Sequence, residues 1–249
     1  MHESDFVHRE DTVDDTRPST ANTRLLRFLQ RDPRPEISLT IWQAFRTQAF
    51  WLMALTFAIW AAMPGIVTVH IGPFLAEELD VSYVVAVSAL SFFAATSLIG
   101  RIGFGVLADY VNVRALLASL LVMQGIGLFL FSHVQTLAQV PLYVIVFSIP
   151  YGGTLPLRHV LQGYLFGRRQ FGTIGGFLQF VDLPATASAP VWIGFLADTF
   201  AGGYRIGFQI LSGMLVIAAL AVLLIRRPRP PLPTDQLPSF ISGLKWREP

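Results

Sequence analysis

The 249-residue sequence has no cysteine and little charge. The absence of cysteine excludes disulfides and thiolate metal sites. Charged residues make up 14% of the chain and hydrophobic residues 53%, whereas a soluble domain carries about a quarter charged residues. The charge is concentrated toward the two ends, and the mean hydropathy is +0.55. This composition indicates a membrane protein with a strongly apolar middle.

Several motifs of other protein classes are also missing. The first 36 residues contain no apolar run after a basic start, so we expect no secretory signal there. No P-loop is present, which argues against the membrane subunit of an ATP-driven pump. The serines lack the Gly-x-Ser-Gly surround of a rhomboid-like intramembrane protease, so we expect no enzyme, and we also expect no cofactor and no metal. The pI of about 9.2 reflects arginines beside apolar segments, which is typical of membrane orientation rather than of nucleic-acid binding.

The alternation of polar and apolar segments predicts three regions. Residues 1–37 form a polar, flexible tail or linker, residues 38–226 a bundle of membrane-spanning helices, and residues 227–249 a Pro-rich cytoplasmic tail. Six apolar segments are each near the roughly 20 residues that cross about 30 Å of hydrocarbon. They lie at about 50–72, 83–107, 113–132, 140–163, 172–197 and 205–225.

A short amphipathic helix is expected just before the first span. Ser38 or Thr40 is suited to cap it, and Ile41, Trp42 and Phe45 recur at helical spacing. Such a helix would lie in the membrane interface with its aromatic side chains pointing inward.

The arginines fall mainly on one side of the predicted spans. That side carries Arg24, Arg27, Arg31, Arg34, Arg46, Arg114, Arg168, Arg169, Arg226, Arg227 and Arg229. The opposite side carries Glu77, Glu78, Asp80 and Asp198, with Arg205 as its one arginine. The positive-inside rule assigns the Arg-rich side to the cytoplasm, and six spans place both termini there. We therefore expect a multi-pass protein of the cell membrane, surrounded by the lipid bilayer.

Proline and glycine are concentrated in the first and fourth spans. Residues 63–65 are expected to interrupt the first span, and residues 149–156 are expected to interrupt the fourth. If spans one to three and four to six form an inverted repeat, these breaks match. Paired breaks of this kind mark the solute cavity of a transporter. The alternative is that the prolines only kink the helices and help their packing.

Three motifs lie in the order found in one family of transporters. Residues 105–109, Gly-Val-Leu-Ala-Asp, and then Arg114 resemble the cytoplasmic loop signature of the major facilitator superfamily, Gly-x-Leu-Ala-Asp-Arg-x-Gly-Arg-Arg. Residues 164–174 and 190–198 resemble a loop and a helix end in the C-terminal half of its monocarboxylate-type members. The signature is incomplete, because Tyr110, Asn112 and Val113 replace the usual Arg, Gly and Arg.

The resemblance, over about residues 38–226, implies the fold class. We expect an all-α membrane protein whose six helices form one half-bundle of the superfamily, a 3+3 inverted repeat. Family members usually have twelve spans in two halves, and this chain resembles the second half preceded by the central linker. We favour a fragment of a longer transporter. The alternative is a subunit that assembles with a second copy or with another six-helix chain.

The family also implies a function and a gating loop. We expect secondary transport of a small solute, such as a monocarboxylate or another organic anion, by alternating access and possibly together with a proton. Gly105, Asp109 and Arg114 would belong to the gating loop. Gly105 is in addition expected to let two helices approach closely.

Four side chains within the predicted spans are candidates for binding. The resemblance implies that Arg101 binds a substrate carboxylate, whereas the alternative is that it snorkels to the interface or braces the loop beside it. Arg158 is deep enough that it should face a cavity or a partner. Asp182 lies about 18 Å along its span and could exchange a proton while an arginine holds the anion, although a permanent bridge to Arg158 is the alternative. Tyr151 could line the same pocket.

Overall fold

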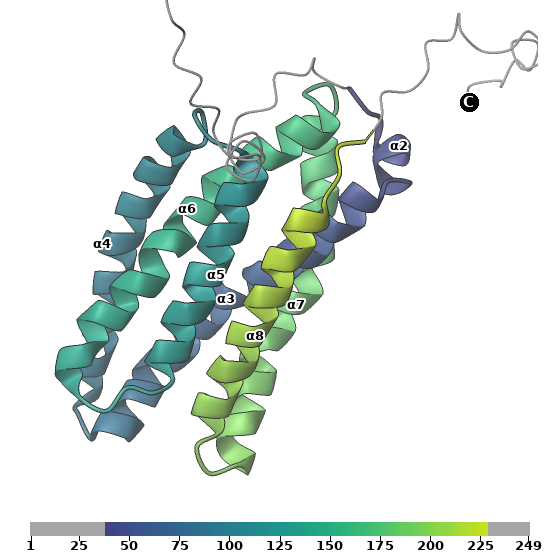
Figure 1. Cartoon of the computed structure of the whole chain (residues 1–249). Coiled ribbons are helices and arrows are strands. Elements are labelled where there is room, and N and C mark those ends of the chain that lie inside the picture. The colour runs from purple at the N-terminus through teal and green to yellow at the C-terminus, as the bar shows by residue number, and fades with distance from the viewer. Residues whose placement is uncertain (1–37, 229–249) are drawn as a thin grey trace, which may run out of the picture.

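The computed structural model describes residues 38–228, which contain helices and connecting turns and no strand (Figure 1). The predicted tail 1–37 and nearly all of the predicted tail 227–249 lie outside this range. A short helix, α2 (Ile41–Phe45), comes first. Six long helices follow: α3 (Gln48–Leu79), α4 (Tyr83–Leu107), α5 (Val113–Phe131), α6 (Val140–Phe166), α7 (Phe171–Thr199) and α8 (Gly203–Leu224), with a 3₁₀ turn, η1 (Leu137–Gln139), before α6.

The six long helices confirm the six predicted spans, because each is long and apolar enough to cross a membrane. The largest difference in length is at the end of the first span. It was predicted to end at residue 72, but α3 continues through Pro73 to Leu79. Asp80 then ends the helix with a left-handed backbone, φ 49°, a conformation that a short polar side chain tolerates.

The predicted breaks at residues 63–65 and 149–156 are wrong. Pro64 lies inside the continuous helix α3, and Pro150 and Pro156 lie inside the continuous helix α6. Threonine hydroxyls sit beside two of these prolines: Thr68 donates to the Pro64 carbonyl at 2.8 Å, and Thr154 donates to the Pro150 carbonyl at 3.0 Å. Membrane helices keep proline without unwinding when neighbouring helices and hydroxyl side chains support the backbone.

The helix before the first span is present as α2. Thr40 is its N-cap, with a capping box to Gln43, so the second of the two predicted caps is the correct one. The inward orientation is right for Phe45, whose ring packs at 4.5 Å from the Phe50 ring. Trp42 is 77% exposed on the outside of the bundle, so its orientation toward the bilayer stays a prediction. The rings of Trp42 and Phe45 lie 6.2 Å apart, as expected for residues three apart on one face of a helix.

The helices are arranged as two related triplets, α3–α5 and α6–α8. α4 packs along α6, α7 packs along α3, and α5 packs along α8. In a repeat of three helices, α3 corresponds to α6, α4 to α7 and α5 to α8. The contact of α4 with α6 then corresponds to the contact of α7 with α3, and the contact of α5 with α8 corresponds to itself. This pattern is the expected 3+3 inverted repeat, and the structure confirms the all-α half-bundle.

The α4–α6 pair is joined by glycines. A Cβ added at Gly100 would collide with the backbone carbonyl of Ile149, and one added at Gly152 would collide with that of Ser97. Within the same contact, the hydroxyls of Thr96 and Ser148 share a buried 2.6 Å hydrogen bond.

Gly105 was expected to let α4 and the helix after its loop, α5, approach closely, but no atom of α5 lies within 4 Å of a Cβ added there. An added Cβ at Gly105 would lie 4.0 Å from Pro156, an ordinary van der Waals distance. The glycines one to two turns earlier on α4 and on the facing part of α6 bring the backbones of α4 and α6 together instead.

Each end of the bundle is closed by contacts between distant segments. Where α2 begins and α8 ends (Figure 1), Leu39 donates to the Phe166 carbonyl at 3.0 Å. At the other end, Arg205 forms a two-bond pair with Glu78, with its Nε at 2.9 Å and Nη2 at 2.5 Å from the carboxylate oxygens. Arg205 was the single arginine expected on this side, and the structure pairs it with an acid.

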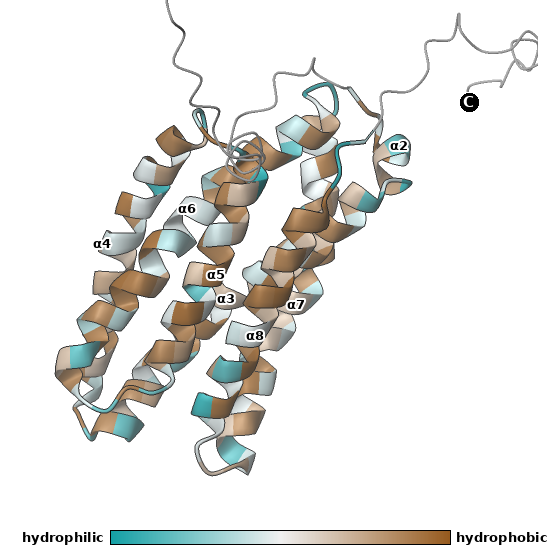
Figure 2. Cartoon of the chain, in the orientation of Figure 1, coloured by the Kyte–Doolittle hydropathy of each residue, from teal (hydrophilic) through white to brown (hydrophobic). Residues whose placement is uncertain are grey.

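The outer surface of the bundle is apolar. Figure 2 shows hydrophobic residues along the lengths of the six long helices and hydrophilic residues mainly toward their ends. α4 and α7 are the least buried, with 28% and 17% of their most apolar windows inside the structure. Large side chains such as Ile102 on α4 and Phe180 on α7 are more than half exposed. These two helices therefore offer the largest unpaired apolar faces.

Candidate functional site

A buried ion pair joins α6 to α7. Nη2 of Arg158 lies 2.6 Å from Oδ2 of Asp182, and the two side chains are 10% and 4% exposed. The Arg158 guanidinium also lies 4.8 Å from the centre of the Phe57 ring on α3. The pair is therefore enclosed by three helices, and the sequence placed both residues deep in their spans without deciding whether they meet.

The Asp182 carboxylate keeps acceptor capacity beyond this contact. Neither of its oxygens has a well-aligned hydrogen bond with any residue in 38–228. Its close contact with Arg158 involves Oδ2 only. A buried carboxylate is stable only when it is paired and its lone pairs are satisfied. Asp182, twelve residues into the 29-residue helix α7, is therefore well held by Arg158 but incompletely satisfied.

Tyr151 belongs to an aromatic cluster beside the pair. Its ring lies 5.3 Å from the Trp60 ring in a stacked arrangement, 5.2 Å from Phe93 and 6.0 Å from Phe147. These rings come from α3, α4 and α6. The cluster approaches the ion pair through α3, because the Trp60 ring also packs at 6.2 Å against Phe57.

Phe57 is a site residue that the sequence did not single out, and Trp60 is one that the sequence allows as a pocket residue but favours as a packing residue. Trp60 is 6% exposed, and its indole N–H has no hydrogen-bond partner in the described part of the chain. An unsatisfied buried donor is uncommon and costly. The available signal was a tryptophan three residues after a phenylalanine in the middle of a predicted span, which is equally typical of ordinary core packing.

Arg101 lies on the same side of the bundle as Tyr151. It is exposed near the end of α4 and forms no ion pair with any other residue in 38–228. Its positive charge is close enough to act electrostatically on the Tyr151 phenol. The structure thus associates two of the candidates, Arg101 and Tyr151, and separately pairs the other two.

The residues of the loop motif have different surroundings. Asn112 caps α5, because its side-chain oxygen accepts from the Arg114 amide at 3.0 Å. The Arg114 side chain instead reaches the end of α8, where Nη1 donates to the Ile225 carbonyl at 2.6 Å. Asp109 is exposed in the turn between α4 and α5 and borders a cleft beside α6. Arg114 therefore ties two helix ends together rather than serving only the loop.

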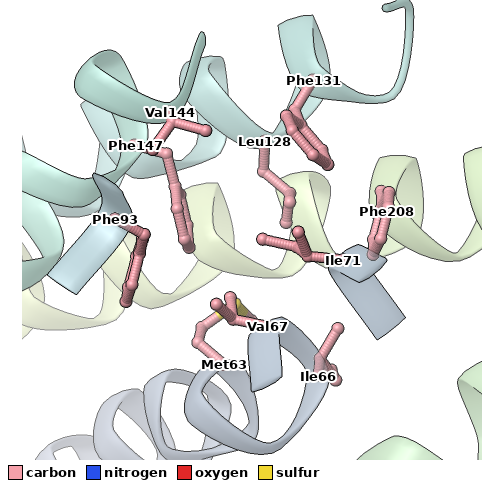
Figure 3. A pocket seen from close by; sticks show the side chains of 10 residues that line it. All are labelled: Met63, Ile66, Val67, Ile71, Phe93, Leu128, Phe131, Val144, Phe147 and Phe208. Atoms are coloured by element: carbon pink, nitrogen blue, oxygen red, sulfur yellow. The ribbon is translucent and has the colours of Figure 1, made fainter. Parts of the chain in front are cut away.

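An enclosed hollow in the middle of the bundle contains none of the candidates. It measures about 10 Å³, and Figure 3 shows ten apolar side chains converging on it, Phe93 and Phe147 among them. A hollow of this size holds one water molecule at most, and a wholly apolar one stays dry. It is a packing gap between α3, α4, α5, α6 and α8, not a solute site.

The fold and these side chains define a multi-pass helical membrane protein with a few ionisable groups held inside. Comparison with protein families gives the particular family: the model of the Major Facilitator Superfamily matches residues 73–248. The match covers more than half of the chain, so the chain belongs to the major facilitator superfamily, whose members are typically membrane transporters. No match to a curated protein was found.

Proposed function

We propose that this chain is one six-helix bundle of a secondary transporter for a small organic anion such as a monocarboxylate. The observation that carries the proposal is the buried pair of Arg158 and Asp182, 2.6 Å apart and almost sealed from solvent. Charged side chains at membrane depth are rare, and they usually mark a solute or proton path. Guanidinium suits a carboxylate because it binds one through two parallel hydrogen bonds.

The pair supports an exchange of one carboxylate for another. An incoming solute carboxylate would take the place of Asp182 on Arg158, and Asp182 would take up a proton. One positive charge then faces one negative charge before and after the exchange. Anion and proton would move together by alternating access, with no unpaired ion left in the low-dielectric interior.

The surrounding side chains support a place for the rest of the solute. The stacked rings of Tyr151 and Trp60 provide an apolar wall, and the unused indole N–H of Trp60 is a ready donor for a second polar group. Arg101, exposed on the same side as Tyr151, would attract the anion first. Gly105, Asp109 and Arg114 would form the gating loop at the cytoplasmic end.

The exposed faces of α4 and α7 support a second bundle as the partner. A rocking mechanism needs two bundles around a central site, and a second copy or another six-helix chain would cover these faces. The arginine distribution supports a location in the cell membrane with both termini in the cytoplasm. A subunit that transports nothing until its partner is present is the second candidate, favoured by the same exposed faces.

The first test measures binding and uptake of radiolabelled lactate by the full chain in lipid nanodiscs and proteoliposomes. We expect Arg158→Gln to abolish binding and Arg226→Gln, an exposed arginine past the end of α8, to leave it unchanged. Binding without uptake would indicate the subunit that waits for its partner. No binding of lactate or of a panel of other carboxylates would contradict the proposal.

The second test concerns the proton. We expect Asp182→Asn to keep anion binding and to lose the pH dependence of uptake, because an amide cannot take up the proton. Uptake by Asp182→Asn that still follows the pH gradient would remove the proton role while leaving the anion site in place.

A further inference from the structure

An open groove lies between α2 and the first turns of α7, at the end of the bundle where α2 begins and α8 ends. It has a volume of about 550 Å³. Its lining residues in the described part of the chain are Ile41, Trp42, Phe45, Arg46, Thr173 and Phe177. None of them belongs to the ion pair of Arg158 and Asp182 or to the aromatic cluster of Tyr151, so the groove is separate from the proposed solute site.

Contacts between segments far apart in the sequence hold α2 beside α7. The Ile41 amide donates to Oε1 of Gln170, the residue before α7, at 2.6 Å. The rings of Phe45 and Phe177 meet edge to face, with their centres 4.6 Å apart. The groove is therefore a feature of the folded bundle and not a gap beside a loosely attached helix.

The apolar part of the groove consists of aromatic rings that reach the surface. Trp42 and Phe177 are 77% and 41% exposed. Phe45 contacts both, because its ring centre lies 6.2 Å from that of Trp42 and 4.6 Å from that of Phe177. Tryptophan beside the end of a span is typical of the level of the lipid headgroups, and exposed rings next to it suit the adjoining part of an acyl chain.

The groove also carries two polar donors that are not engaged. The side chains of Arg46 and Thr173 are both exposed, and neither makes a hydrogen bond or an ion pair with any residue in 38–228. Arg46 is the one charged side chain among the lining residues of this range, so no acid there offsets its charge. A ligand can therefore reach both donors without displacing another contact.

These features together fit a ligand with an anionic head and an apolar tail. A guanidinium binds phosphate oxygens through a fork of N–H groups, and a threonine hydroxyl can donate to a further oxygen. A free phosphate would leave the rings of Trp42 and Phe177 uncovered, whereas a lipid would cover them. Under the orientation proposed above, the groove faces the cytoplasmic leaflet, which is the one that carries anionic lipids.

We propose that this groove binds one anionic phospholipid. Its phosphate would lie on Arg46 and Thr173, and the adjoining part of an acyl chain on Trp42, Phe45 and Phe177. The proposal requires that the bundle lie in a bilayer, but it does not depend on anion transport. A second copy of the chain is the alternative occupant, because the groove shares α7 with the face proposed for a second bundle.

The experiment uses native mass spectrometry of the full chain in a mild detergent to count the lipids bound to each protein molecule. The probes are dioleoylphosphatidylglycerol, which is anionic, and dioleoylphosphatidylcholine, which has the same acyl chains and no net charge. We expect the first phosphatidylglycerol to bind about tenfold more tightly than the first phosphatidylcholine, the effect of one charge-assisted hydrogen bond. Equal affinities would overturn the proposal. So would a dimer that selects neither lipid, since a second copy would then cover the groove.

Arg46→Gln tests the contact with the headgroup. The change removes an exposed charge and breaks no contact within residues 38–228, so the protein should fold and the preference for phosphatidylglycerol should disappear. Arg226→Gln removes the same charge from an exposed residue past the end of α8 that does not line the groove, and it should keep the preference. Equal losses in the two variants would show a general attraction to the basic end of the bundle and would exclude the groove as the site.

Phe177→Ala tests the contact with the acyl chain. Loss of this ring should weaken the binding of both lipids about tenfold and leave the preference between them unchanged, because the two probes have the same tails. Phe195→Ala changes a ring that is 63% exposed toward the other end of α7 and does not line the groove, so it should alter neither affinity. If Phe177→Ala does not fold, Trp42→Ala provides the same comparison at a more exposed ring. Equal effects of the groove variant and Phe195→Ala would mean that acyl chains coat the helices without a defined site.

Discussion

Arg158 and Asp182 each depend on the other for a charge inside the bundle. The two side chains are almost fully buried, and the Phe57 ring covers the guanidinium. Removing one partner leaves an ion in a medium of low dielectric constant, whereas removing both leaves two neutral groups of similar shape. The pair should therefore behave non-additively in a double-mutant cycle.

We expect Arg158→Gln or Asp182→Asn alone to lower the free energy of unfolding by about 3–5 kcal/mol. The double variant should lose less than either single variant, because no unpaired charge remains. Denaturant unfolding in detergent, followed by far-UV circular dichroism, measures all four proteins. Arg101→Gln serves as the control, since this exposed residue has no ion-pair partner among residues 38–228. Losses that simply add would show that the two side chains are not coupled.

At the scale of single residues, the sequence predicts how deep a side chain lies in the membrane but not which neighbour it faces. Counting residues from a span's end places Arg158 and Asp182 at membrane depth, because each helical residue rises by 1.5 Å. Whether they face each other depends on the rotation and spacing of α6 and α7, and a single sequence does not fix these. Trp60 could be named as a possible pocket residue but not distinguished from a packing residue for the same reason, because the lack of an acceptor beside its indole N–H is a tertiary property.

Among the elements, α4 and α6 form a pair whose backbones approach closely. Gly100 faces the Ile149 carbonyl, and Gly152 faces the Ser97 carbonyl, so each helix has a position without a side chain where the backbone of the other fits. Small residues allow such an approach in membranes, where van der Waals packing and hydrogen bonds take the place of the hydrophobic effect between helices.

Gly100→Ala should lower the stability of the bundle by about 3 kcal/mol, because the new methyl group would force the two backbones apart. Gly103→Ala, on the same helix one turn later, provides the control, since an added Cβ there meets nothing within 4 Å. The midpoint of thermal unfolding in detergent compares the two variants. Equal midpoints would show that the close contact contributes nothing.

Element boundaries could be predicted well where polar turns follow apolar runs and poorly where proline lies inside a span. The predicted segment 83–107 coincides with α4. α3 passes the predicted end at residue 72 by seven residues although Pro73 lies there, and Pro150 and Pro156 suggested a break that α6 does not have. Local rules overestimate the effect of proline in helices that neighbouring helices support. The prediction that Gly105 lies at a close helix contact was wrong for another reason, because the place of a residue in a motif does not show which atoms lie opposite it.

For the whole molecule, the 3+3 arrangement could be anticipated from the resemblance and is confirmed. The exposed faces of α4 and α7 could not, because segments of similar hydropathy bury different shares of their surface. These faces are the natural place for the second bundle that the proposed function needs.

Because the chain has no cysteine, the position of the second bundle can be tested with single cysteines introduced on the exposed faces. Phe180→Cys on α7 and Ile217→Cys on α8 lie at similar distances from the same end of the bundle, and the native residues are 65% and 55% exposed. If a second copy supplies the partner bundle, a short bis-maleimide should link two copies through position 180 and not through position 217. Equal yields at the two positions would indicate random collision in the bilayer and would argue against α7 as the interface.

The ion pair also has a mechanical meaning. The glycine contacts hold α4 against α6, and α7 packs along α3. The pair of Arg158 and Asp182 links these two helix pairs, because it joins α6 to α7. Under the proposed function, a solute carboxylate that took the place of Asp182 on Arg158 would remove this link between two helices that are each about 40 Å long.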